Sequence, residues 1–221
     1  MFCSFKRFRS GLVFGGGLVA LFLMQMCRIM PIIGSTHSFF SLSDALMPIT
    51  GALGIWMGIA ATLVRSGLTF SGASYSLFSL VYHLPGFCAS VSWAWPNRFI
   101  RCFLPVLCMV LFWVHPIGFY AAPYALYWLI PVGIFLLKKQ GIFFEALSAT
   151  FIAHAVGSVI WLYLKALPVA VWWSLIPVVP FERLLNATLM TMVYYGVCEV
   201  GKVIRFFRLS WRLRVESMAK N

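Results

Sequence analysis

Long apolar runs follow one another along this chain and are separated by short polar gaps. The runs cover residues 11–33, 40–64, 68–95, 99–115, 119–137, 142–164 and 178–201. A helix of about 20 apolar residues is long enough to cross a bilayer. The hydrophobic pattern by itself therefore predicts about seven membrane-spanning helices.

The distribution of basic residues changes this count. Lys6, Arg7 and Arg9 precede the first apolar run, and Lys and Arg recur through segment 202–221. Because Lys and Arg concentrate on the cytoplasmic side, we expect both termini to be cytoplasmic, which requires an even number of spans. About eight spans result if the run 40–64 and its continuation to residue 72 form two short helices that turn at the glycine-rich segment 54–58.

Composition agrees with a membrane protein. Hydrophobic residues make up 62% of the 221 positions and charged residues 10%, against roughly 45–50% and 25% in soluble domains. The net charge is +12, and the basic residues lie in the gaps between apolar runs. This pattern argues against nucleic-acid binding. We predict an all-α polytopic membrane protein with one transmembrane domain over 1–201. The basic segment 202–221 is predicted to be an amphipathic cytoplasmic tail on the anionic leaflet.

The cysteines do not indicate a metal site. Cys3, Cys27, Cys88, Cys102, Cys108 and Cys198 lie mostly in or beside apolar runs, without a Cys-x-x-Cys spacing. Neither a zinc site nor a disulfide framework is indicated. We therefore predict no metal and no cofactor.

Glu182 and Arg183 are adjacent at the start of the last apolar run, in a chain with only five acidic residues. A charge in hydrocarbon costs roughly 2.5–3.5 kcal/mol on insertion scales, so such a pair usually serves a ligand, an ion or each other. An ordinary salt bridge at the water interface is the structural alternative. The nearby Trp172, Trp173 and Asn186 favour a binding site.

A second interpretation is enzymatic. Ser74 and His154 lie in separate apolar runs among small residues, an arrangement compatible with a buried dyad in which imidazole deprotonates a hydroxyl. The segments 71–75 and 153–157 weakly resemble the Gly-x-Ser-Gly and Ala-His-x-x-Gly motifs of rhomboid intramembrane proteases. A histidine hydrogen-bonded between packed helices is the alternative without catalysis.

Two longer stretches carry another resemblance. Residues 41–61 contain a proline, then a glycine-rich turn, then small residues, and residues 150–187 contain a histidine, an aromatic segment and the Glu182–Arg183 pair. Together they resemble the substrate-binding S components of energy-coupling factor vitamin transporters. The segment 82–86, with His83, resembles the fourth helix of the thiamine-binding members.

The resemblance implies a six-helix core with an inserted helical hairpin over 99–137 that turns at His115-Pro116. It also implies a multi-pass protein of the bacterial cytoplasmic (inner) membrane that binds a vitamin-like small molecule and catalyses no reaction. ATP hydrolysis would belong to separate ATPase subunits and a transmembrane coupling subunit. That partner is expected to dock on small residues that allow close helix approach, namely Gly11, Gly15, Gly16 and Ala20.

The resemblance also implies one outward-facing pocket in which aromatic rings stack the ligand and polar groups hold its edge. Its expected residues are His37, Asp44, His83, His154, Trp161, Trp172, Trp173, Glu182, Arg183 and Asn186. A rhomboid-like serine protease using Ser74 and His154, or a structural membrane protein without a ligand, are the alternatives.

Overall fold

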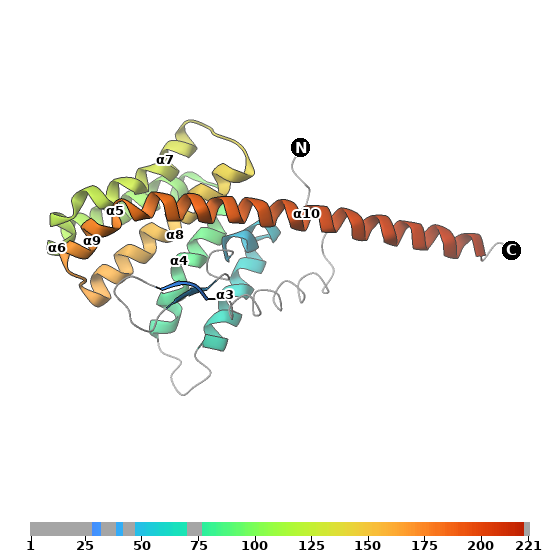
Figure 1. Cartoon of the computed structure of the whole chain (residues 1–221), viewed down its shortest axis with the longest axis horizontal. Helices are drawn as coiled ribbons and strands as arrows, with labels where there is room; N and C mark the ends of the chain where they lie inside the picture. The colour runs from blue at the N-terminus through green and yellow to red at the C-terminus, as the bar shows by residue number, and fades with distance from the viewer. Residues whose placement is uncertain (1–27, 32–38, 42–46, 70–76, 219–221) are drawn as a thin grey trace.

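A computed structural model describes residues 28–31, 39–41, 47–69 and 77–218, and this part of the chain is predominantly helical (Figure 1). The predicted helical architecture is confirmed at this level. In chain order the elements are β1 (Arg28–Pro31), β2 (Phe39–Ser41), η2 (Met47–Leu53), α3 (Ile55–Thr69), α4 (Leu77–Ala94), η3 (Phe99–Phe103), α5 (Leu104–Val114), α6 (Pro116–Tyr120), η4 (Ala122–Trp128), α7 (Leu129–Leu136), α8 (Ile142–Lys165), α9 (Val169–Leu175) and α10 (Val178–Met218).

A small antiparallel ladder interrupts the first two predicted spans. In it Met30 of β1 lies opposite Phe40 of β2, and Pro31 lies opposite Phe39. The prediction of continuous helix over 11–33 and from residue 40 onward is wrong at these positions. The hydrophobic pattern could not predict these strands, because a short apolar run is compatible with either a strand or a helix.

The predicted turn in segment 54–58 falls at Gly54. This residue has φ of 116°, a conformation that glycine adopts without steric cost, and it separates the 3₁₀ helix η2 from α3. Both elements pack against α4. At Gly51 an added Cβ would collide with the backbone carbonyl of Ser90, so glycine permits this close approach of η2 and α4.

Helix α8 is the centre of the bundle and packs against α4, α5, α7 and α10. Small side chains on its surface are completely buried, including Ala146, Ala149 and Ala155. Small residues let neighbouring helices approach closely, which is the usual mode of helix packing in membranes. The helix begins after Gly141, at φ of 127°, and ends at Ala166 in the left-handed conformation.

Residues 99–137 form a helical hairpin that begins with the π-helix η3. Helix α5 ends at His115, whose side chain accepts a hydrogen bond from the backbone N–H of Ile117, and Pro116 begins α6. The hairpin packs on α8 through α5, η4 and α7. It supplies Phe112 and Trp128 to the largest hydrophobic core of the described residues.

Helix α10 is continuous over 41 residues, about 60 Å at 1.5 Å per residue. One face of its first half is buried, with Arg183, Ala187, Met190 and Tyr194 at spacings of three and four residues. The helix passes through Gly201 without a break and extends beyond the other helices in Figure 1. The predicted tail is thus helical to Met218 and continues α10.

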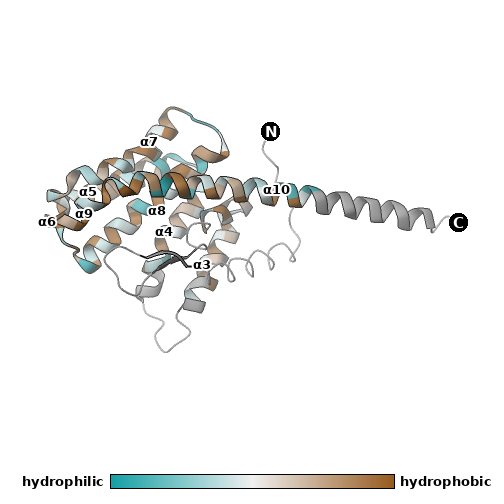
Figure 2. Ribbon diagram, in the orientation of Figure 1, coloured by the Kyte–Doolittle hydropathy of each residue, from teal (hydrophilic) through white to brown (hydrophobic). Residues whose placement is uncertain are grey.

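Among the described residues, α8 is the one helix that is both long and apolar enough to cross a membrane, and shorter apolar helical segments cover 55–64, 99–114 and 122–136. The predicted count of about eight spans is therefore not established by helix length. In Figure 2 apolar positions predominate along α7 and along the first half of α10.

Candidate functional site

A hydroxyl from the hairpin meets two polar side chains of α8. The Tyr124 hydroxyl lies 2.9 Å from Nε2 of His154 and 3.1 Å from Oγ of Ser158. His154 and Ser158 are four residues apart and therefore share a face of the helix. Tyr124 has a single O–H, so when it donates to one of these partners it accepts from the other.

The start of α10 brings a charged pair to the same region. Arg183 is 9% exposed and forms an ion pair with Glu182 through Nη2. Its Nε is buried and makes no hydrogen bond within the described part of the chain. Arg183 lies one helical turn after Val179, which is buried in the same hydrophobic cluster as Tyr124 and Ala155. We call Tyr124, His154, Ser158, Glu182 and Arg183 the polar cluster.

Aromatic rings pack around Tyr124, at one side of the polar cluster. The Trp172 ring lies edge-on to Tyr124 with ring centroids 5.0 Å apart, and Phe112 stacks on Tyr124 at 5.6 Å. Trp128 packs edge-on against both Tyr124 and Phe112. Phe112, Trp128 and Trp172 are almost completely buried. They give the cluster an apolar wall, and a low local dielectric strengthens the polar interactions inside it.

Four residues of the predicted pocket are therefore brought together, namely His154, Trp172, Glu182 and Arg183. Asn186 is half-buried and lies one helical turn beyond Glu182 on α10. Trp173 does not face the cluster, because it is 49% exposed and its Nε1 donates to the backbone carbonyl of Tyr120.

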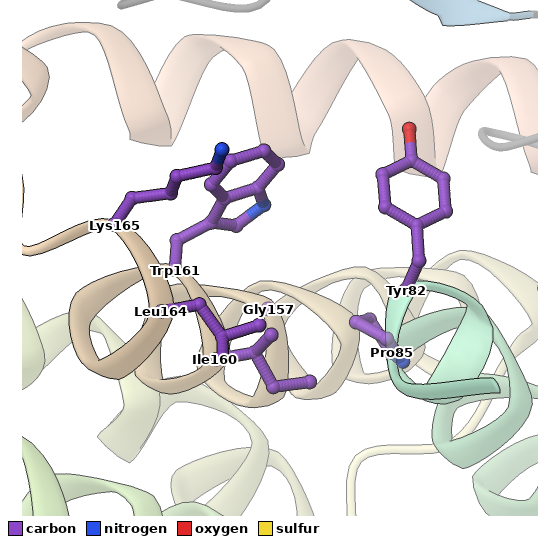
Figure 3. A pocket seen from close by; sticks show the side chains of 7 residues that line it. All are labelled: Tyr82, Pro85, Gly157, Ile160, Trp161, Leu164 and Lys165. Carbon is purple, nitrogen blue, oxygen red and sulfur yellow. The ribbon is translucent and has the colours of Figure 1, made fainter. Parts of the chain in front are cut away.

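Trp161 lies at a second feature, a shallow depression between α4 and α8 that His83 does not line. Its volume is small, about 20 Å³, and Figure 3 shows its lining residues Tyr82, Pro85, Gly157, Ile160, Trp161, Leu164 and Lys165. The Trp161, Lys165 and Tyr82 side chains point toward α10 in that view. His83 is buried, with its ring edge-on to Tyr82 at 5.2 Å.

The depression continues the polar cluster along α8. His154, Ser158, Trp161 and Lys165 follow one another at spacings of four, three and four residues, so they occupy one face of the helix. A ligand bound across both features would thus contact a single side of α8.

Several predicted residues lie outside the described part of the chain. They are His37, Asp44, Ser74, Gly11, Gly15, Gly16 and Ala20. The predicted docking surface and the Ser74–His154 dyad consequently remain predictions. In the described structure the partner of His154 Nε2 is the Tyr124 phenol.

Sequence reasoning missed a second charged pair, between Arg101 in η3 and Glu145 in the first turn of α8. The Arg101 Nη1 donates to Glu145 Oε1 at 3.2 Å, and Nη2 donates to Glu145 Oε2 and to the Ser92 carbonyl. Arg101 is only 4% exposed. The sequence signal that could have indicated this pair is a charged residue inside each of two long apolar runs, Arg101 in 99–115 and Glu145 in 142–164.

Tyr124 and Ser158 were also missed. Ser158 stands one turn after His154 on a predicted helix, which could have indicated it, whereas the position of Tyr124 depends on how the hairpin folds back.

Within the described residues, no group of His, Cys, Asp and Glu side chains could hold a metal ion.

No protein-family model, curated protein or solved structure matches this chain. Its function is therefore argued from the chemistry of the polar cluster and the surface around it.

Proposed function

We propose that this chain is the membrane-embedded substrate-binding subunit of an ATP-driven uptake transporter for a vitamin-like small molecule. The observation that carries the proposal is the meeting of η4, α8 and α10 around the polar cluster. Buried polar and charged groups are costly unless they are paired or used for function. Three separate segments contribute to this one cluster, which favours a ligand site over an isolated structural bond.

The outer surface of the bundle supports placement in a bilayer. On α10, Phe181, Leu185 and Met192 are 75%, 67% and 66% exposed, and further large apolar side chains are exposed along α5. Soluble monomers rarely expose so much contiguous apolar surface. We place the protein in a bacterial cytoplasmic membrane as a multi-pass protein, with α8 as its central span.

The cluster is suited to binding. It combines an ion pair, a phenol, an imidazole and a hydroxyl beside an aromatic wall, as small-molecule sites commonly do. In this proposal the ATPase subunits and the transmembrane coupling subunit are separate chains, and the coupling subunit docks on Gly11, Gly15, Gly16 and Ala20.

The test is purification of the full chain from membranes in mild detergent, followed by mass spectrometry of extracted small molecules. We expect a vitamin-like molecule to accompany the unmodified chain and Arg98→Gln, and to be absent from Arg183→Gln. Arg98 is a matched control because it is exposed and precedes η3, away from the cluster. An equal amount of the same molecule in all three preparations would contradict the assignment of Arg183.

Partner capture tests the transport role separately. Coupling and ATPase subunits should accompany the unmodified chain, while Gly15→Leu should lose them and retain the small molecule, because a bulky side chain blocks close helix approach without changing the cluster. Failure to recover ATPases with the unmodified chain would contradict the transporter role.

A further inference from the structure

The guanidinium of Arg183 has hydrogen-bonding capacity that the described structure does not use. An arginine carries five N–H donors in a planar fork. Within the described residues the hydrogen bond of this group is the one from Nη2 to Glu182, and Nε is buried with no acceptor. Buried donors are nearly always paired in native proteins. The unused donors of Arg183 therefore indicate a missing acceptor.

Glu182 is a poorly placed partner for this arginine. The two residues are adjacent in α10, and adjacent helix positions do not face each other. The Glu182 side chain is also more exposed than that of Arg183, at 20% against 11%. Glu182 can therefore leave Arg183 for the surroundings more easily than Arg183 can leave the cluster.

The described structure offers Arg183 no second carboxylate. Glu145 pairs with Arg101, and Glu199 pairs with Lys202 in a later turn of α10. Tyr124 and Ser158 are hydrogen-bonded to each other, and Tyr124 also bonds His154. The positive charge of Arg183 thus depends on one partner, Glu182, which is adjacent in sequence and partly exposed.

Resting on the proposed function, we propose that the transported molecule carries a carboxylate that binds the Arg183 guanidinium through two parallel hydrogen bonds and displaces Glu182. Arginine and carboxylate groups match in this bidentate geometry. The neutral body of the ligand would extend along the face of α8 that carries Ser158 and Trp161. Glu182 then acts as the partner of Arg183 in the empty site rather than as a ligand contact.

Matched probe pairs test this inference on the full chain in detergent. The probes are biotin with biotinamide, nicotinate with nicotinamide, pantothenate with pantothenol, and the cation thiamine, with laurate as a lipid-derived carboxylate. Dissociation constants are measured by ligand-dependent melting and equilibrium dialysis. We expect at least one vitamin carboxylate to bind about ten- to a hundredfold more tightly than its neutral counterpart, the range expected for charge-assisted hydrogen bonds.

Two variants separate the roles of the charged pair. Arg183→Gln should remove the preference for the carboxylate member of the pair. Glu182→Gln should tighten carboxylate binding by about threefold or more, because the competing anion is gone. Glu199→Gln is the matched control on the same helix, since its pair with Lys202 is more than half exposed, and it should leave binding unchanged.

The outcomes are distinguishable. Three results would overturn the inference and leave a binding function standing. The first is that thiamine or a neutral probe binds more tightly than the vitamin carboxylates, and the second is that laurate binds as tightly as they do. The third is that Glu182→Gln binds the carboxylates more weakly than the unmodified chain. Binding of no probe, whatever its charge, would overturn the proposed vitamin-binding function together with the inference. If Arg183→Gln does not fold, the probe pairs and Glu182→Gln still decide the matter.

Discussion

The Arg101–Glu145 pair gives a sharp prediction about stability. Its guanidinium joins three elements, because it bonds both carboxylate oxygens of Glu145 in α8 and the Ser92 carbonyl in α4 from its own position in η3. In Glu145→Gln the arginine keeps its charge in a buried position but loses the counter-charge. A buried arginine without its partner is a strongly destabilising defect.

The size of the effect follows from the burial of the two side chains. Breaking a buried ion pair by removing one partner costs about 3–5 kcal/mol. Because the Glu145 side chain is 20% exposed and that of Arg101 is 5% exposed, solvent screens part of the pair, and we expect about 3 kcal/mol, at the low end of that range. For a chain of this length, that loss lowers the melting temperature by about 6–12 °C.

The assay compares thermal melting in one detergent for the unmodified chain, Glu145→Gln, Arg101→Met and the double variant Arg101→Met/Glu145→Leu. Replacing both charges by apolar groups is often close to neutral, so the double variant should melt well above either single variant. Glu199→Gln controls for loss of an exposed pair with Lys202, which contributes about 0–1 kcal/mol.

Additive losses in the double variant would refute this reasoning, because they would show that each side chain stabilises the fold through contacts other than the shared pair. Each kcal/mol of lost stability lowers the melting temperature by about 2–4 °C. A melting temperature of Glu145→Gln within about 2 °C of the unmodified chain would therefore also refute the reasoning.

Three further predictions concern packing and topology. Gly118→Ala should destabilise the fold by about 1–3 kcal/mol or more in thermal melting, because the added Cβ would collide with the Phe112 carbonyl. Gly133→Ala has open space around the added Cβ and should stabilise α7 by up to about 1 kcal/mol. Phe112→Ala should lose about 3–5 kcal/mol, while Phe119→Ala, at a site that is 66% exposed, should lose far less. Reporter fusions at the two ends of the chain should report the same side of the membrane, since basic residues concentrate at both ends. Reporters on opposite sides would contradict an even number of spans.

Local patterns were sufficient for several features of this protein. Apolar runs of span length predict helices because a helix satisfies its backbone polar groups within one segment, and the glycine-rich turn falls at Gly54. The same local reasoning identified His154, Glu182 and Arg183, because a polar group in an otherwise apolar helix is conspicuous without any knowledge of its partners.

Other features depend on contacts between distant parts of the chain. Tyr124 reaches His154 across 30 residues and Arg101 reaches Glu145 across 44, and neither pairing follows from the periodicity of a single element. The family resemblance implied that Trp161, Trp172 and Trp173 share one pocket. In the structure the way α8, α9 and the hairpin pack directs these three rings to different surroundings, because the direction of a side chain is decided by helix rotation and by the neighbour it packs against.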